Sequence, residues 1–379
     1  MNETFKLRVA VDACSLGRER TGVGNYIYDI LHPLCETETF ITWFLFSNAE
    51  ISFPDLPNVV MRPNCGRARG VVWHNFVLPK HLRDNGIDVF WGANGFIPLI
   101  DITEIGTIVT IHDLVHYFCP DTSQPLVRWS RRVFQPLSAK KADLVLCNSD
   151  ATAQDVRRIY GVESWAIVRP NIPSIFVPPS VEEIAAIREK YDLPDGFILV
   201  VGTLEPRKNL PEFLRAIIDC QADGVELPIV VHAGGCGWLA EETNLVIKQA
   251  EKFGLFRRLG FVPKRDLPAL YGCCTAFCMP SIYEGFGIPV AEAMSCGATV
   301  MHGDHPSMIE AARGRGLQFE PTRAGMVAFL KSFASNVFSH SKLQVNSVDP
   351  VNNHEILLAA IAKIACNRGF PYATNVCSS

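Results

Sequence analysis

The chain has 379 residues, of which 48% are hydrophobic and 20% are charged, and its formal net charge is −4. This length predicts two domains with ample material for a core in each. The composition excludes a disordered chain, a collagen and a small disulfide scaffold. A chain this close to neutral is not built mainly to coat nucleic acid, so we expect no nucleic-acid partner. No run of 18 apolar residues and no signal-peptide pattern occurs, so we expect a cytoplasmic protein without a membrane-spanning helix.

Short apolar runs that indicate strands alternate with helical patterns in both halves of the chain. Continuous apolar strands separated by helices are typical of parallel sheets covered on both faces. We therefore predict an α/β fold of two doubly wound, Rossmann-like domains, each with a ligand crevice at the carboxyl ends of its strands. In chain order, the expected strands are residues 7–13, 41–47, 59–63, 88–93, 107–113, 144–149 and 165–170, then 197–203, 228–235, 257–262, 275–281 and 298–303. The clearest helical patterns are residues 24–34, 124–142, 210–221, 240–254, 265–274, 289–297 and 354–366.

A proline-rich stretch marks the expected boundary between the domains. Four prolines fall between Pro170 and Pro179, and proline fits neither a central strand nor a helix interior. We expect one domain over residues 1–175 and a second over residues 176–350. A C-terminal helix and tail over residues 351–379 follow, and their return to the first domain is left open.

The strongest functional signal is SIYEGFGIPVAEAMSCGATV, which joins an expected strand to an expected helix. Its glycines let a ligand approach the backbone closely. The N–H groups of Phe286, Gly287 and Ile288 form an anion site at the helix start. Glu284 and Glu292 flank that site and suit hydroxyl groups on either side of a phosphate. The structural alternative is a glycine turn with one surface and one capping glutamate, and we favour function over it.

A second signal is FILVVGTLEPRKNL, in which Arg207 and Lys208 follow a buried strand and precede a helix. Adjacent cations at the carboxyl end of a strand suit a diphosphate. Exposed Arg-Lys pairs are more often merely solvated. Their expected place at the mouth of a crevice is what favours a binding role.

Two weaker signals lie in the first half. Gly22 and Gly24 separate the first expected strand from the first helix, but they lack the full spacing of a dinucleotide loop. They better fit a loop that lets phosphates or an acceptor approach. His112 and Asp113 directly follow a buried strand, where a side chain points into the crevice. A histidine in such a place is about equally often structural and functional.

Together these motifs resemble glycosyltransferase family 4, a family of retaining GT-B glycosyltransferases. EGFGIPVAEAMSCG looks like the family's Glu-x7-Glu motif, and GTLEPRKNL looks like its Arg/Lys diphosphate loop. TGVGNY, TIHDL and CNSDATAQDV match its N-terminal domain in order and spacing. The resemblance extends to about Pro321. Within the family, the chain is similar to bacterial mannosyltransferases that build O-antigens and exopolysaccharides.

The resemblance implies a donor site in the second domain. Arg207 and Lys208 would neutralise the leaving nucleoside diphosphate, Glu284 would hold hydroxyls of the donor sugar, and Glu292 would hold the ribose hydroxyls. The backbone N–H groups named above would also meet the diphosphate or the sugar. Phe261 and Val262 would line the base pocket.

The resemblance also assigns the first domain to the acceptor. His112 would contact the donor sugar near the reacting carbon, and Gly22 or Gly24 would contact the phosphate. No Asp-x-Asp motif occurs in the chain, and the scattered cysteines form no zinc spacing. We therefore expect no cofactor and no metal, with cations and a helix start balancing the diphosphate charge.

Two basic stretches bear on the acceptor. Five cations and no acid lie between Arg62 and Arg83, and the same holds between Ser123 and Ala142. Solvated helix faces are the commoner explanation. Trp73, Phe76 and Trp129 are interleaved with these charges, a combination that suits an anionic membrane bearing a lipid-diphosphate acceptor. Peripheral attachment to the inner face of the plasma membrane is left open.

The leading hypothesis is a metal-independent, retaining glycosyltransferase. It would move a hexose, with mannose from GDP-mannose as the leading case, to a growing glycan on a polyprenyl diphosphate in surface polysaccharide synthesis. A GT-B-like sugar-nucleotide epimerase, a Rossmann oxidoreductase and a non-catalytic sugar-nucleotide-binding partner stay open as alternatives. The imperfect glycine loop argues against NAD.

Overall fold

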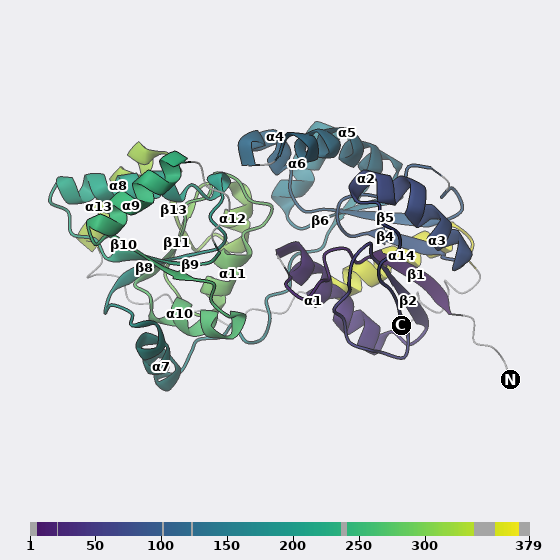
Figure 1. Ribbon diagram of the computed structural model, residues 1–379, viewed down its shortest axis with the longest axis horizontal. Coiled ribbons are helices and arrows are strands. Elements are labelled where there is room, and N and C mark those ends of the chain that lie inside the picture. Colours follow the sequence, from purple (N-terminus) through teal and green to yellow (C-terminus); the bar gives the residue numbers. More distant parts are fainter. Residues whose placement is uncertain are drawn as a thin grey trace. The chain divides into compact units, whose positions relative to one another are not determined.

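The computed structural model describes residues 6–20, 22–100, 102–122, 124–235, 241–336 and 353–370. The chain divides into two compact units (Figure 1). Unit 1 comprises Met1–Asn171 and Pro350–Ser379, and unit 2 comprises Ile172–Asp349. Each unit is a parallel sheet with helices on both faces, which confirms the predicted pair of doubly wound α/β domains.

Unit 1 contains a seven-stranded sheet in the order β3-β2-β1-β4-β5-β6-β7. Every neighbouring pair is parallel. All seven strands expected in the first half of the chain are confirmed, because buried parallel strands carry continuous apolar runs. The strands are β1 (Leu7–Asp12), β2 (Ile41–Phe46), β3 (Val59–Arg62), β4 (Val89–Gly92), β5 (Gly106–Ile111), β6 (Leu144–Cys147) and β7 (Trp165–Ile167).

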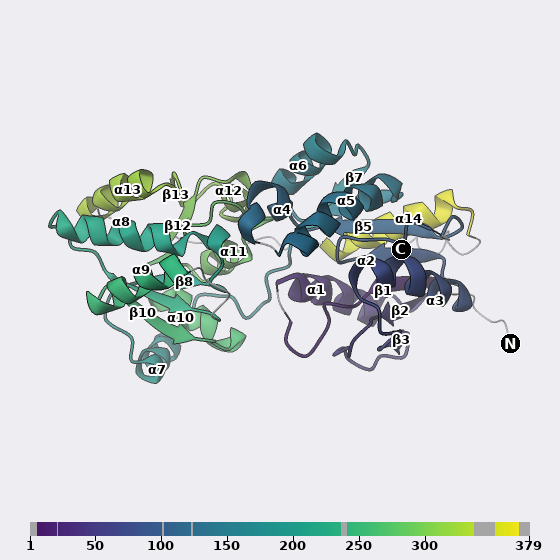
Figure 2. The same ribbon diagram turned by 45° about the horizontal axis from the view of Figure 1, so that its top comes forward.

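Helices from both ends of the chain cover this sheet. The helix α14, the last in the described part of the chain, packs beside α1 and against β4 and β5, so it belongs to unit 1 (Figure 2). Its buried face, including Leu357, Ile361 and Ile364, joins the same core as α1. The helices are α1 (Gly22–Thr37), α2 (Gly70–Val72), α3 (Leu78–Asp84), α4 (Val115–Phe118), α5 (Pro125–Lys141), α6 (Asp150–Tyr160) and α14 (Asn353–Asn367), with a π-helical turn η1 (Trp73–Val77) and a 3-10 turn η2 (Pro120–Thr122).

Unit 2 contains a six-stranded parallel sheet in the order β10-β9-β8-β11-β12-β13. Five of its strands match the expected runs. The sixth, β13, was not expected, because it has three residues and only its last, Phe319, is buried. The strands are β8 (Phe197–Val201), β9 (Ile229–Ala233), β10 (Phe256–Gly260), β11 (Ala276–Met279), β12 (Val300–Gly303) and β13 (Leu317–Phe319).

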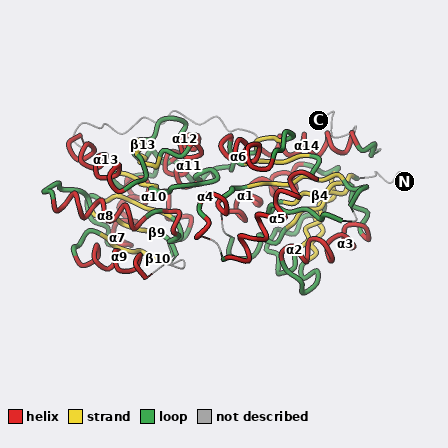
Figure 3. The backbone as a smooth tube through the Cα atoms, turned by 90° about the horizontal axis from the view of Figure 1, so that it is seen from above, coloured by secondary structure: helices red, strands yellow, loops and turns green. Residues whose placement is uncertain are grey.

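Successive residues of the unit 2 strands point to opposite faces of the sheet. Phe197 and Leu199 of β8 pack with α10 and α11, whereas Ile198 and Val200 pack with α8 and α13. The strands therefore form a middle layer between two layers of helices (Figure 3). The helices are α7 (Val181–Tyr191), α8 (Leu210–Ala222), α9 (Glu241–Lys252), α10 (Leu267–Cys273), α11 (Ile288–Ser295), α12 (Pro306–Ala311) and α13 (Arg323–Asn336), with 3-10 turns η3 (Pro206–Lys208) and η4 (Lys264–Asp266).

Both sheets change direction at an internal strand. In unit 1 the chain builds outward from β1 to β2 and β3 and then crosses to β4 on the other side of β1. In unit 2 the same reversal occurs between β8 and β11. Crevices at the carboxyl ends of strands at such a reversal are where open α/β sheets bind ligands. Each unit therefore has one favoured position for a site.

Candidate functional site

Two loops meet at the reversal point of unit 2. One follows β8 and forms the turn η3 with Arg207 and Lys208, and the other follows β11 and carries Ser281 and Glu284. The N–H of Ile282 donates to the carbonyl of Arg207 at 2.9 Å, which ties the loops together. Residues more than 70 positions apart in the sequence are thus brought into one cluster, as the crevice prediction requires.

The carboxylate of Glu284 is the centre of this cluster. Its Oε2 lies 2.5 Å from Nη1 of Arg207, and its Oε1 lies 2.7 Å from Nζ of Lys208. The hydroxyl of Ser281 donates to Oε1 at 2.9 Å. The Glu284 carbonyl accepts the hydroxyl of Ser307 at 2.8 Å. Side chain and backbone are therefore both fixed, and the three charged side chains form a mostly buried network.

The electrostatics of the cluster depend on both cations. Burial alone raises the pKa of Glu284, but Arg207 and Lys208 outweigh it and lower the pKa to about 2. Burial lowers the pKa of Lys208, although Glu284 acts in the opposite direction. Arg207 also pairs with Glu205 at 3.0 Å. Without a ligand, carboxylates already occupy both cations, so an incoming diphosphate competes with Glu284 for them.

This arrangement differs from the role the resemblance implies for Glu284. We expected its carboxylate to face sugar hydroxyls beyond the phosphate, whereas in the structure it lies against the two cations themselves. The cause is the short loop after β11, which brings Glu284 back over the turn η3. Its side chain can still meet a sugar hydroxyl, because an ionised carboxylate has about four lone-pair positions.

The helix α11 begins at the glycine-rich segment, as expected. Gly287 precedes it with φ of 100°, in the left-handed region that favours glycine. A Cβ at this position would also lie 3.3 Å from the side chain of Met308. The N–H groups of Phe286, Gly287 and Ile288 lie at this helix start, with Pro289 in the first turn. The sequence motif and the helix start therefore coincide.

The second acid of the motif is in a different environment. Glu292 is buried inside α11 and accepts a hydrogen bond from the hydroxyl of Tyr271 at 3.0 Å. Burial raises the pKa of Tyr271, and the charge of Glu292 raises it further. One acid of the pair is held by cations and the other by a tyrosine hydroxyl.

The two residues expected to line a base pocket follow β10 and differ sharply in exposure. Phe261 is 82% exposed, and Val262 is buried in the core beneath it. An exposed phenyl ring beside a buried anchor presents a flat apolar face, which suits stacking on a planar ligand.

In unit 1, the two glycines at the start of α1 are not equivalent. A Cβ on Gly24 would lie 2.3 Å from the carbonyl oxygen of Ser15, whereas a Cβ on Gly22 would meet nothing within 4 Å. Gly24 is therefore required for the loop after β1 to pack on the helix.

We expect Gly24→Ala to lower the free energy of unfolding by about 1–3 kcal/mol, because the added methyl group forces this loop away from α1. Urea unfolding followed by circular dichroism measures the change. Gly22→Ala is the matched control and should stay within about 0.5 kcal/mol of the wild type. Equal effects of the two substitutions would show that the loop packing is not what Gly24 provides.

His112 is held in one tautomer. Its Nε2–H donates to the carbonyl of Ala93 at 2.8 Å, and the edge of Tyr26 lies against its ring. Burial lowers the pKa of His112, with Arg131 acting the same way and Asp113 opposing it. At neutral pH the ring is therefore uncharged and its Nδ1 is a hydrogen-bond acceptor.

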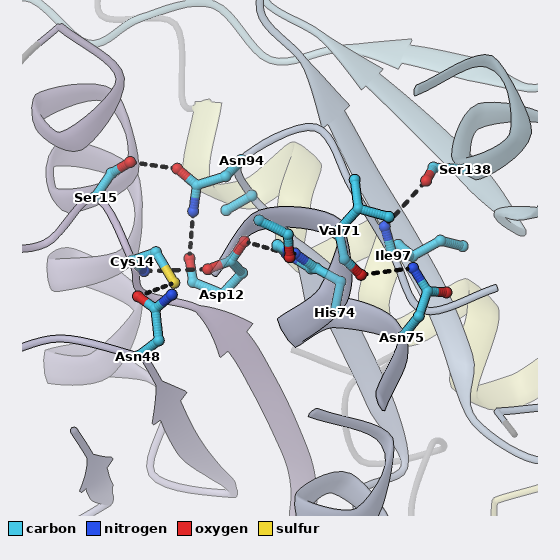
Figure 4. A network of polar contacts seen from close by, with 12 residues as sticks. Asp12, Cys14, Ser15, Asn48, Val71, His74, Asn75, Asn94, Ile97 and Ser138 are labelled. Atoms are coloured by element: carbon cyan, nitrogen blue, oxygen red, sulfur yellow. Dashed lines mark hydrogen bonds and ion pairs between the residues drawn. The ribbon is translucent and has the colours of Figure 1, made fainter. Parts of the chain in front are cut away.

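His112 lines a pocket of about 380 Å³ at the reversal point of unit 1, where a crevice was expected, and Asp12 and His74, which sequence reasoning missed, line it too. Asp12 ends β1, and its carboxylate lies 2.9 Å from Nε2 of His74 (Figure 4). Asn94, after β4, donates to the carbonyl of Asp12 and accepts the hydroxyl of Ser15. Asp12 could have been found by the strand-end rule that selected His112. No sequence signal marks His74, because the π-helical turn that carries it has no periodic pattern.

One residue that we expected at the surface is buried. Trp73 was expected among the aromatic residues of a basic surface, but its side chain is fully buried and its indole N–H donates to the carbonyl of Cys65 at 2.6 Å. The π-helical turn rotates Trp73 inward, whereas Phe76 stays 73% exposed. Among the described residues, no group of three or more histidine, cysteine or acidic side chains is arranged to hold a metal ion.

Comparisons with known families agree with this geometry. Residues 20–171 match Glycosyltransferase Family 4, and residues 183–327 match Glycosyl transferases group 1. O-antigen chain mannosyltransferase B of Escherichia coli is 31% identical over 324 residues, which cover 79% of this chain and 83% of that protein. O-antigen chain mannosyltransferase RfbU of Salmonella typhimurium is 23% identical, over 82% of this chain and 86% of that protein.

Solved structures share the fold over almost the whole chain. Sucrose-phosphate synthase from Thermosynechococcus elongatus superimposes with a TM-score of 0.70 at 14% identity, covering 99% of this chain and all of that one. Anabaena HepE in complex with UDP and glucose gives 0.63 at 16% identity, with the same coverage. The fold is therefore GT-B, and the chain belongs to glycosyltransferase family 4.

Proposed function

We propose that the chain transfers a hexose from a nucleotide sugar to a growing glycan with retention of anomeric configuration. Mannose from GDP-mannose is the leading case, because two relatives that match 79% and 82% of this chain are named as mannosyltransferases. The observation that carries the proposal is the cluster of Arg207, Lys208 and Glu284 at the reversal point of unit 2. We assign unit 2 to the donor and unit 1 to the acceptor, with the boundary near residue 175.

In this proposal the cations and the start of α11 hold the diphosphate. Arg207 and Lys208 exchange part of their contact with Glu284 for phosphate oxygens, and Glu284 turns to hydroxyls of the donor sugar. Glu292, fixed by Tyr271, accepts hydrogen bonds from the ribose. The base contacts the exposed ring of Phe261. Charge-assisted contacts to phosphate in a mostly buried site stabilise the charge that develops as the diphosphate leaves.

The transfer exchanges one bond at the anomeric carbon. The bond from this carbon to the diphosphate oxygen breaks, and the acceptor hydroxyl oxygen bonds to the carbon from the same face. The hydroxyl proton passes to the departing diphosphate, so the products are the glycan, extended by one sugar, and the nucleoside diphosphate. His112 lies near the reacting carbon in this scheme, and as a neutral ring it can accept a hydrogen bond from a sugar hydroxyl through Nδ1.

Activity is expected to survive chelation. Arg207, Lys208 and the α11 start supply the positive charge that a divalent ion would otherwise bring to the diphosphate. We expect initial rates in excess EDTA to stay within about twofold of those with added Mg²⁺ or Mn²⁺. Complete loss on chelation, restored by either ion, would contradict this assignment of the charge balance.

The acceptor is proposed to be lipid-linked, and α5 supports contact with an anionic membrane. Leu126 and Trp129 are 75% and 57% exposed, and they lie among Arg128, Arg132 and Lys140. Exposed apolar side chains flanked by cations are typical of helices that lie on anionic lipid surfaces. None of the helices in the described ranges is long and apolar enough to cross a membrane.

Leu126→Glu should weaken binding to vesicles of anionic phospholipid by about tenfold, because it removes an inserted apolar group and adds a repelled charge. Co-sedimentation with phosphatidylglycerol vesicles measures this change. Val181→Glu, at a 78% exposed apolar position of α7 in unit 2, is the matched control. Equal losses would show that general charge, and not the α5 face, governs the binding.

Calorimetric titration with GDP, UDP, dTDP and ADP tests the donor half of the proposal. We expect one of the four to bind at a single site, with GDP the leading case. Absence of binding by all four would overturn the assignment of unit 2 to a nucleotide sugar.

A further inference from the structure

The pocket of unit 1 has the features of a built ligand site. Its volume of about 380 Å³ lies within the usual range for small-molecule sites. It lies at the reversal point between β1 and β4, where open α/β sheets bind ligands. Residues from eight parts of the unit line it: the carboxyl ends of β1, β2, β4 and β5, and the helical segments α1, α2, η1 and α5.

A buried ion pair underlies one wall of this pocket. Nδ1 of His74 lies 2.9 Å from the carbonyl oxygen of Gly70, which can only accept, so Nδ1 carries a hydrogen. Nε2 faces the carboxylate of Asp12, whose other oxygen accepts the N–H of Cys14 at 3.1 Å. Burial raises the pKa of Asp12 and lowers that of His74, but their contact outweighs burial, so His74 lowers the pKa of Asp12 and Asp12 raises the pKa of His74. The pair is therefore an imidazolium and a carboxylate.

The charges around the pocket cancel. The ionisable groups that line it are Asp12, Cys14, His74, His112, Asp113 and Arg131. Burial raises the pKa of Cys14, so its thiol is uncharged. His112 is neutral because burial lowers its pKa. Two carboxylates and two cations remain, so the lining has no net charge. This pocket therefore disfavours a phosphate or a carboxylate ligand, in contrast to the Arg207–Lys208 cluster of unit 2.

The groups nearest the open pocket are amides and hydroxyls. The side chains of Ser15, Asn48 and Asn94 are partly exposed there, and the partly exposed ring of Phe96 flanks them. Hydroxyl and amide groups can both donate and accept hydrogen bonds, as sugar hydroxyls do. Asn94 is held by Asp12 and Ser15, so it is already oriented before a ligand arrives (Figure 4).

The buried pair holds this wall in place through the π-helical turn. His74 is the second residue of η1, and π-helical turns are rare and are frequent at functional sites. Asp12 is fully buried, and the His74 side chain is only 6% exposed. The pair therefore acts through the residues that it positions, and not by direct contact with a ligand.

We propose that the unit 1 pocket is the subsite for an uncharged hexosyl residue of the acceptor glycan, contacted by Ser15, Asn48 and Asn94 and positioned by the Asp12–His74 pair. This inference rests on the proposed function and adds the class of acceptor group. A neutral sugar ring matches the cancelled charges, the paired donors and acceptors, and the aromatic flank.

Acceptor kinetics test the subsite with octyl glycosides of mannose, galactose and N-acetylglucosamine, and with the 6-phosphate of whichever serves best. We expect the neutral glycoside to exceed its phosphorylated twin by about tenfold or more in kcat/KM. Asn94→Ala and Asp12→Asn should each raise the acceptor KM by about tenfold. They should leave the donor KM and the slow hydrolysis of the donor within about twofold. A purely structural role would lower all of these activities together.

A control variant separates the subsite from general damage to unit 1. Asn85→Ala removes an amide that donates to the carbonyl of His81 at the end of α3, away from the residues that line the pocket. It should not change the acceptor KM. If Asp12→Asn does not fold, Asn94→Ala and the neutral-to-phosphorylated ratio still decide the question.

The outcomes distinguish this inference from the proposed function. Transfer to neutral glycosides with an unchanged KM in Asn94→Ala and Asp12→Asn overturns the subsite and keeps the glycosyltransferase. Preference for the phosphorylated twin overturns the neutral-sugar assignment. If no sugar is transferred from any donor, titration of the same glycosides into the protein by saturation-transfer NMR decides. Binding that Asn94→Ala weakens then supports the subsite, and no binding overturns it.

Discussion

Lys208→Ala is expected to lower the rate of sugar transfer by about 10²–10³-fold, the effect of removing one charge-assisted contact to a leaving group. Lys208 lies 2.7 Å from Glu284 in a mostly buried cluster. Water that enters after the substitution therefore stabilises the diphosphate charge much less than the ammonium group does. The free nucleoside diphosphate should also bind more weakly, since the contact persists in the product. Initial rates with saturating donor and titration of the diphosphate measure the two effects.

Lys331→Ala is the matched control for this substitution. Lys331 of α13 also belongs to unit 2 and pairs with a carboxylate at 2.8 Å, that of Asp223 directly after α8, but both side chains of this pair are exposed. Exposed pairs contribute little, so we expect wild-type rates. Wild-type turnover and affinity in Lys208→Ala would refute the placement of the diphosphate at this cluster.

Glu284→Gln is expected to separate sugar transfer from nucleotide binding. The carboxylate occupies Arg207 and Lys208 in the absence of ligand, so its neutralisation frees both cations. Free diphosphate should bind as well as in the wild type or more tightly, while turnover falls by about 10–100-fold because a charged hydrogen bond to the donor sugar is lost. Paired titrations with nucleotide and with intact donor measure the split.

The same variant should be less stable without ligand. Two mostly buried cations then lack their shared carboxylate, and adding the nucleoside diphosphate should recover the melting temperature more than it does for the wild type. Because the folded-state pKa of Glu284 lies near 2, below its usual 4.5, its contribution is complete above pH 4.5. It is lost as the pH falls from 4.5 toward 2, so wild type and variant should converge in stability over that interval. Weaker binding of the free nucleoside diphosphate by Glu284→Gln than by the wild type would contradict the competition between carboxylate and phosphate.

The sequence predicts the sheets well because a buried parallel strand requires a continuous run of apolar residues. Residues 197–203 and 275–281 are apolar on both faces, and the loops after them contain Arg207, Lys208 and Glu284. The strand-end rule then brings these loops together without any knowledge of side-chain contacts. The strand β13 was not predicted, because it has three residues with one buried side chain and therefore no continuous apolar run.

The side-chain contacts on which the chemistry depends could not be predicted from the sequence. The pairing of Glu284 with two cations depends on the path of a short loop, which no periodicity encodes. His74 reaches Asp12 across 62 positions only because η1 widens into a π-helical turn and rotates Trp73 into the core. In sequence, Trp73 and Phe76 have the same aromatic character in the same basic stretch, and only the fold distinguishes the buried ring from the exposed one.

Transfer of radiolabelled sugar is the direct test of whether the chain is a glycosyltransferase whose activity depends on Lys208. The wild-type chain and Lys208→Ala are incubated with labelled GDP-mannose, UDP-glucose, dTDP-rhamnose and ADP-glucose in the presence of membrane lipid and neutral octyl glycosides. We expect label in an acceptor from one donor, with release of one nucleoside diphosphate per sugar and loss of both products in Lys208→Ala. Binding of a nucleotide sugar without label in any acceptor, or a labelled epimer of the donor as the sole product, would contradict it.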